Sequence, residues 1–181
     1  LRFWGMIMDK KLATRLWPFM LTLAGIALDQ LTKWIVLATV APGPLGVSVV
    51  GDVVKIIHVY NPGIAFSIGW SLPDGIKAVL FGILPLAVIA LVVVVYLRSD
   101  DLTSFQRWCV AGIIGGGLGN LLDRFFRPDG VLDFIDIKFY GLFGLERWPT
   151  FNVADSSVVV CGVLLLLSLL LGFRNAKGEG K

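Results

Sequence analysis

The residues best suited to chemistry in this chain are acids and amides that lie at the edges of apolar segments. Asp133 and Asp136 lie in the apolar run 131–136, and Asp155 follows Asn152 where another apolar run begins. Two carboxylates held close together in a partly dry site cannot both ionise easily, so one keeps a proton and the other acts as a base. Such a pair can activate a water molecule for attack on a peptide carbonyl and stabilise the oxyanion that forms.

The residues alone do not decide which acid would pair with Asp155. Asp123, Asp133 and Asp136 remain alternatives. Strand alternation would put Asp133 on one face of the 131–136 run and Asp136 on the other. Asp155 lies slightly inside its apolar run, so it should resist ionisation if it has no partner.

Other polar residues recur at helical spacing or in turns. Asp29 and Lys33, four residues apart, share one helix face and predict either a pair that anchors helices or one that orients a substrate. Asn61-Pro62-Gly63 is a turn signal, although the Asn61 amide could also bind a peptide backbone. Asn120, Asp123 and Arg124 share a face just after the cluster 115–119, whose glycines permit either close helix packing or room for a ligand.

Several other chemistries fit the sequence poorly. His58 is the one histidine, and it is better explained by packing than by a Ser-His-Asp site. Cys109 and Cys161 both lie in apolar runs, which favours packing over a disulfide or a zinc site. The basic residues do not gather into a nucleic-acid patch. We therefore expect no metal, no cofactor and no nucleic-acid partner.

The composition indicates that lipid is the main solvent of this chain. Of its 181 residues, 56% are hydrophobic and only 16% are charged, with a mean hydropathy of +0.82. Soluble domains usually have about 25% charged residues. A bilayer-spanning helix needs about 20 mostly apolar residues. Four such segments are predicted, at about 16–38, 76–97, 105–122 and 152–173, within a single domain that covers residues 1–181.

The predicted fold is therefore a four-transmembrane-helix bundle with two additional outer segments. Residues 39–70 contain two runs rich in β-branched residues, Val47–Val50 and Val53–Tyr60, which predict a small β element. Residues 123–151 include the aromatic, glycine-rich stretch Phe139–Trp148, which predicts a short interfacial segment at the membrane surface.

Flanking charges predict the orientation. Basic residues precede the first span, flank the short link between spans two and three, and follow the fourth span. The positive-inside rule then places both termini in the cytoplasm and both larger connections outside, although four basic residues in the second outer loop oppose this. Residues 1–8 could be an extension, and the first span is expected to be retained instead of cleaved.

The motifs, taken in order, resemble the lipoprotein signal peptidases (signal peptidase II). The matching motifs are Asp29-Gln30…Lys33, Asn61-x-Gly63…Phe66, Gly116-Gly117…Gly119-Asn120…Asp123-Arg124, Val131-x-Asp133-Phe134 and Phe151-Asn152-x-Ala154-Asp155. The resemblance spans nearly the whole chain. In this chain Pro62 replaces the commoner threonine, the stretch 125–130 is longer than usual, and residues 138–149 match no family pattern.

The resemblance implies a bacterial inner-membrane aspartic endopeptidase, a monomer in membrane lipid with its site near the periplasmic face. It would cleave diacylglyceryl-modified prolipoproteins before the lipid-bearing cysteine. Asp133 and Asp155 would be the catalytic dyad, Asp123 would be structural, and the 39–70 segment would form a cradle. The implied supporting residues are Asp29, Lys33, Asn61, Gly63, Asn120, Arg124, Asn152 and Ala154.

Two other classes of function remain as alternatives. Intramembrane acids and bases could line the ion path of a transporter or channel. However, four spans leave little room for a path, and the polar residues cluster at one end of the spans. The acids could also serve only the assembly of a structural membrane protein.

Overall fold

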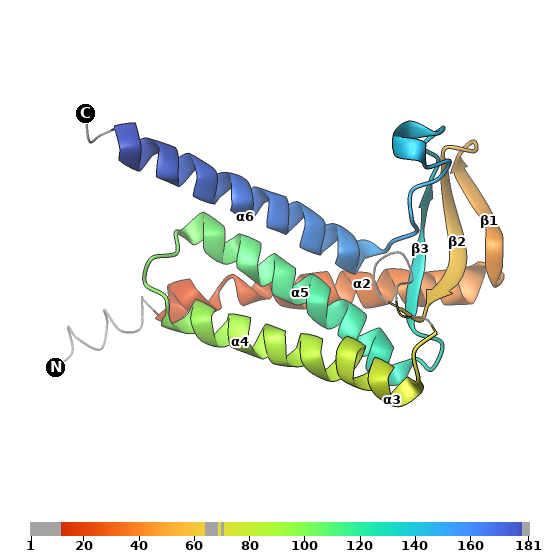
Figure 1. Ribbon diagram of the computed structural model, residues 1–181, viewed down its shortest axis with the longest axis horizontal. Coiled ribbons are helices and arrows are strands. Elements are labelled where there is room, and N and C mark those ends of the chain that lie inside the picture. The colour runs from red at the N-terminus through yellow and green to blue at the C-terminus, as the bar shows by residue number, and fades with distance from the viewer. Residues whose placement is uncertain (1–11, 64–68, 70, 179–181) are drawn as a thin grey trace.

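Helices and one small sheet make up the computed structural model, which describes residues 12–63, 69 and 71–178 (Figure 1). The long helices are α2 (Phe19–Thr39), α4 (Leu84–Arg98), α5 (Ser104–Phe126) and α6 (Val153–Gly178). The strands are β1 (Gly43–Val50), β2 (Val54–Asn61) and β3 (Val131–Ile137). Short helical turns are α3 (Asp74–Lys77), the π-helical η2 (Ala78–Ile83) and the 3-10 turn η3 (Leu142–Gly144).

The sheet lies at one end of the helix bundle. The start of α2 and the end of α6 both lie at the opposite end (Figure 1). Helix α5 runs through the middle of the bundle and contacts α2, α4 and α6. The β-element predicted for residues 39–70 is present as β1 and β2, and β3 adds to it from the second connection.

Three helical stretches among the described residues are long and apolar enough to cross a membrane. They are Leu12–Thr39, Asp74–Arg98 and Val153–Gly172, which coincide with three of the predicted spans. The remaining predicted span, 105–122, is helix α5. Its glycines and polar residues make it less apolar, and it is the helix whose side chains are mostly shielded by its neighbours. Exposed leucine and valine side chains give α2, α4 and α6 apolar outer surfaces.

Local signals define both ends of α5. Thr103 and Gln106 form a capping box in which the Thr103 side chain accepts from the Gln106 backbone at 3.2 Å and Gln106 accepts from the Thr103 backbone at 3.0 Å. This satisfies backbone donors that would otherwise be exposed at the helix start. The helix ends before Arg127, which precedes Pro128, and a residue before proline avoids the helical conformation.

Three consecutive glycines of α5 each face a different helix. A Cβ on Gly115 would lie 3.0 Å from Thr22 Cα of α2, and a Cβ on Gly117 would lie 2.9 Å from Ile89 Cδ1 of α4. A Cβ on Gly116 would overlap the Ala154 carbonyl of α6. The alternative of close helix packing is therefore the one that the structure supports for these glycines.

Gly116→Ala is expected to destabilise the bundle by about 1–3 kcal/mol, because the added methyl group must push α5 away from the backbone of α6. Thermal unfolding in detergent would measure the loss. Gly162→Ala on α6 is the matched control, since its Cβ would meet nothing within 4 Å. Equal melting temperatures for the two variants would contradict this packing argument.

The sheet is antiparallel, with β2 between β1 and β3. Leu132 and Phe134 of β3 pack on Val36 and Val40 at the end of α2. Alternation then turns Asp133 to the other side of the strand, as expected from the sequence.

Candidate active site

A cavity of about 520 Å³ opens where α5, α6 and β3 meet the sheet end of the bundle. Its polar lining includes Asp133 of β3, Asp155 of α6, Asn120 and Arg124 of α5, and Asn61 of β2. Much of the remaining wall is apolar and comes from 148–151 and 158–160. The cavity therefore combines two acids from different elements with largely apolar walls.

Asn152 connects the two acids of this cavity. Its Nδ2 donates to Asp133 Oδ1 at 2.8 Å, and its backbone N donates to Asp155 Oδ2 at 3.1 Å. The Asp155 backbone N in turn donates to Asn152 Oδ1 at 2.9 Å, which gives a reciprocal cap at the start of α6. A local helix-start motif thereby fixes both carboxylates relative to each other.

Asp133 is almost completely buried, with 3% of its surface exposed. Its Oδ2 accepts from Asn61 Nδ2 at 3.2 Å. Burial, followed by the negative charge of Asp155, raises the pKa of Asp133 to about 7, although the hydrogen bonds from Asn61 and Asn152 act in the opposite direction. A carboxyl group in this state can hold a proton at neutral pH.

The raised pKa of Asp133 should make the stability of the fold depend on pH. The folded chain binds the Asp133 proton up to about pH 7, whereas the unfolded chain releases it near the ordinary value of 3.8. The stability that this group contributes should therefore fall as the pH rises from about 4 to about 7 and change little above that. Melting temperatures of the wild type and Asp133→Asn across this range would test it. A difference between them that stays constant with pH would contradict the prediction.

Asn120 holds the second acid. Its Nδ2 donates to Asp155 Oδ1 at 2.7 Å, while its Oδ1 accepts from Lys33 Nζ at 3.1 Å and from Asn152 Nδ2 at 3.0 Å. Because an ammonium group can only donate, Lys33 determines which end of the amide faces it. The amide donor is consequently turned toward Asp155.

Lys33 is the centre of a buried ion cluster beneath the cavity. Its Nζ lies 2.8 Å from Asp29 Oδ2 and 2.8 Å from Asp123 Oδ2, and all three side chains are essentially inaccessible to solvent. The Ala154 backbone N donates to Asp29 Oδ1 at 3.0 Å, which ties α6 to α2. None of Asp29, Lys33 and Ala154 lines the cavity. Of the two alternatives for Asp29 and Lys33, the anchoring pair fits this geometry.

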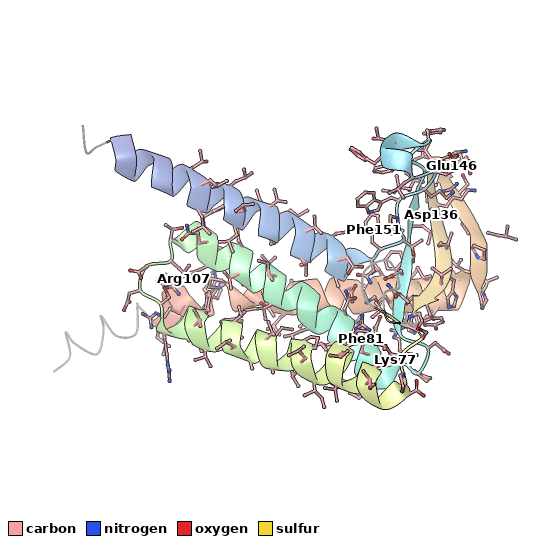
Figure 2. All side chains as sticks on the ribbon, viewed as in Figure 1. Lys77, Phe81, Arg107, Asp136, Glu146 and Phe151 are labelled. Atoms are coloured by element: carbon pink, nitrogen blue, oxygen red, sulfur yellow. The ribbon has the colours of Figure 1, made fainter. Side chains whose placement is uncertain are left out.

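The structure distinguishes the three acids that the residue pattern left open. The Asp123 carboxylate pairs with Lys33 and with Arg127 Nε at 3.1 Å, and it accepts a hydrogen bond from the Leu132 backbone N at 3.1 Å. Asp136 pairs with Arg147 Nη1 at 2.7 Å and lies near Glu146, at the end of the sheet where the 138–149 segment is attached (Figure 2). Of the three, only Asp133 lines the cavity.

The Asn61–Gly63 turn lies at the rim of the cavity. Asn61 Oδ1 accepts from the Gly63 backbone N at 3.1 Å, and Arg124 Nη2 donates to the Gly63 carbonyl at 2.7 Å. The Arg124 guanidinium also lies 5.4 Å from the centre of the Phe81 ring. The hydrogen bond between Arg124 and Gly63 therefore fixes the position of the turn relative to the arginine. Phe66 of the same motif lies outside the described residues.

Segment 138–149, which matched no family pattern, forms part of the cavity wall. Lys138 Nζ and Arg147 Nη2 bind Asp52 at 2.6 and 2.7 Å, which closes the base of the segment on the sheet. Trp148 and Pro149 then line the cavity. Phe143 at the tip is 81% exposed, consistent with the predicted interfacial segment.

Some residues of the site were not predicted. Gln30 Nε2 donates to Asp29, Asp123 and the Gly119 carbonyl, each at 3.1 Å; Gln30 is part of the first matching motif, but no role was predicted for it. Trp148, Thr150 and Ser156 line the cavity without any signal in the residue pattern.

His58 lies away from the cavity and binds the Val40 carbonyl at 2.9 Å, as a packing histidine would. No metal-binding group of three His, Cys, Asp or Glu residues occurs in the part of the chain that the structure describes.

Comparison with known proteins gives a consistent result. A family model described as Signal peptidase (SPase) II matches residues 21–171. The lipoprotein signal peptidase of Treponema pallidum (strain Nichols) is 53% identical over 145 residues, which is 80% of this chain and 78% of that protein. The lipoprotein signal peptidase of Treponema denticola is 47% identical over 161 residues, 88% of this chain and 92% of that protein.

Solved structures of bacterial membrane enzymes share the fold. One, at 2.3 Å resolution, superposes with a TM-score of 0.75 and 26% identity over 87% of this chain and 90% of its own. A second structure, at 1.9 Å resolution, superposes with a TM-score of 0.71 and 27% identity over 84% of this chain and 92% of its own. The predicted membrane bundle and the predicted family are both confirmed. Because the family model covers most of its length, the chain belongs to the signal peptidase II family and is a membrane protease.

Proposed function

We propose that this chain removes signal peptides from diacylglyceryl-modified prolipoproteins by cleaving before the lipidated cysteine, with Asp133 and Asp155 as the catalytic pair. Membership of the lipoprotein signal peptidase family supports the removal of signal peptides from lipoproteins. The observation that carries the catalytic assignment is that both acids line one cavity and are joined through Asn152.

The hydrogen bonds favour different roles for the two acids. Asp155 accepts from Asn120 Nδ2 and from the Asn152 backbone in the first turn of α6, where the helix dipole favours an anion. We assign the base to Asp155 and the shared proton to Asp133. Asp155 takes a proton from water while the resulting hydroxide attacks the carbonyl carbon and Asp133 protonates the carbonyl oxygen. Collapse of the intermediate returns a proton to Asp133 and transfers the Asp155 proton to the leaving nitrogen.

The remaining residues of the motifs would support this pair. Asn152 and Asn120 hold the carboxylates, and the Lys33 cluster holds Asn120. Asn61 and Arg124 line the cavity and would bind the peptide backbone, with Gly63 fixing their arrangement. Val159 and Val160 of α6 line the cavity and are more than half exposed, so acyl chains could reach it from the lipid side.

Helix direction supports the proposed location. The start of α2 and the end of α6 lie at the same end of the bundle, whereas β3 and the start of α6, which carry the two acids, lie at the other end (Figure 1). With the basic flanks of the spans in the cytoplasm, the cavity would lie at the periplasmic face of the bacterial inner membrane. We propose that the enzyme acts there as a monomer surrounded by lipid, without a cofactor.

A cleavage assay with purified protein would test the proposal. Two synthetic preproteins of the same sequence would be compared, one with a diacylglyceryl group on the cysteine and one without. The modified substrate should be cut at the bond before the cysteine, and the unmodified one should not. Cleavage of both at equal rates, or of neither, would refute the substrate assignment.

A further inference from the structure

A second cavity, of about 400 Å³, lies beside the active site, between the start of the α3–η2–α4 stretch and the end of α5. Lys77 and Phe81 on its wall lie at the sheet end of the bundle (Figure 2). Arg124 lines both cavities, so they share a wall. None of the roles assigned above uses this second space.

The charges on its wall favour an anion. Lys77, Arg124 and Arg127 contribute three cations, whereas Asp74 is the one acid among the lining residues. Asp74 lies 3.6 Å from Lys77 Nζ, and its side chain is fully exposed, so water screens this pair. Arg127 is balanced through Nε by Asp123. Among the lining residues, Lys77 and Arg124 thus face one acid, Asp74, and Arg124 is also attracted by Asp155 from the active-site cavity.

Arg127 adds a hydrogen-bond donor that the protein does not satisfy. Its Nε binds Asp123 at 3.1 Å and its Nη2 binds Gln30 Oε1 at 3.4 Å. Its Nη1 is buried and has no partner among the described residues. Buried donors are rarely left in this state, and Arg127 belongs to the wall of this cavity.

The rest of the wall is apolar and continues onto the surface of the bundle. Phe81 is buried, while Ile83 and Phe125 line the cavity and are 58% and 51% exposed. Ile83 belongs to one of the membrane-length stretches. A ligand with only an anionic group would leave these side chains unused, whereas an amphiphile would cover them.

We propose that this cavity binds an anionic phospholipid of the surrounding bilayer. The phosphate lies between Lys77 and Arg127, next to Arg124, and the acyl chains follow Ile83 and Phe125 toward the hydrocarbon. Because Arg124 also lines the active-site cavity, lipid bound here stabilises one position of that guanidinium. Lipid composition would then change substrate binding without any contact with the two acids.

Displacement of a fluorescent phosphatidylglycerol from the full-length protein in neutral detergent would test this site. Lys77→Gln should weaken binding about fivefold, since one basic residue near a membrane surface contributes about 1 kcal/mol. Asp74→Asn should strengthen binding, because it removes the opposing charge. Lys55→Gln is the matched control, as Lys55 on the sheet is exposed to a similar degree, 27% against 25%, and should leave binding unchanged.

Each outcome of this experiment decides the proposal. Equal phosphatidylglycerol affinity in the wild type, Lys77→Gln and Asp74→Asn would overturn it. Inorganic phosphate is the second probe, and displacement by phosphate as effective as by the lipid would reduce the site to a free-anion site and overturn the lipid assignment. The measurement needs no cleavage, so its result is independent of the proposed peptidase reaction.

Discussion

Asp133→Asn and Asp155→Asn are each expected to lower the cleavage rate by about 10²–10⁴-fold, the usual contribution of a positioned acid or base. An asparagine keeps the shape of the side chain but can neither hold the shared proton nor accept one from water. Single-turnover cleavage of a lipid-modified preprotein would measure the loss, with thermal unfolding to show that each variant is folded. Near wild-type cleavage by either variant would refute the dyad.

Two neighbouring acids provide controls for that experiment. Asp136→Asn changes an acid on the same strand whose partner is Arg147, so cleavage should stay within a few-fold of wild type. Asp123→Asn removes a buried partner of Lys33 and should lower stability, while the folded fraction still cleaves. Loss of cleavage in Asp123→Asn with unchanged stability would show that the wrong acid was assigned.

Lys33→Met is expected to produce the largest loss of stability, about 3–5 kcal/mol, because it leaves the buried Asp29 carboxylate without a cation and Asp123 with Arg127 as its remaining cation. Asp29 and Asp123 lie 2.8 Å from Lys33 Nζ and are inaccessible to solvent. Methionine fills a similar volume, so the loss of stability would come from the missing charge and not from a cavity. Denaturation in mixed micelles would measure it.

The same variant has a second expected effect, on catalysis. Without the ammonium group, the Asn120 oxygen keeps Asn152 Nδ2 as its remaining side-chain donor, so the amide that donates to Asp155 is held less firmly. Cleavage by the folded fraction should therefore fall as well.

A lysine on the sheet and a double variant serve as controls for the stability effect. Lys55→Met on the sheet breaks a partly exposed pair with Asp52 and should cost about 0–1 kcal/mol. If Lys33→Met costs no more than Lys55→Met, the buried cluster does not stabilise the fold as argued. Combining Lys33→Met with Asp123→Asn should cost less than the sum of the single changes, since both act on one interaction.

Several features of this protein follow from short stretches of sequence. Hydropathy over about 20 residues predicts the lipid-facing helices, because an apolar helix of this length matches the thickness of the hydrocarbon core of a bilayer. The spacing of Asp29 and Lys33 places both on one helix face, and the spacing of Asn152 and Asp155 allows a reciprocal cap. Alternation in β3 separates Asp133 from Phe134. Each of these relations connects residues within one element, so local geometry is sufficient.

The tertiary structure decided which acid lines the cavity and which residues surround it. The residue pattern does not rank Asp123, Asp133 and Asp136, which are distinguished by their partners in the fold. Asp123 pairs with Lys33, 90 positions earlier in the chain, and Asp136 pairs with Arg147, which lies beyond the end of β3. The faces of Gly115–Gly117 and the cavity wall formed by Trp148 likewise depend on elements that are distant in the chain. A carboxyl group's charge is set by everything that surrounds it once water is removed. That surrounding exists only after the helices and the sheet have come together.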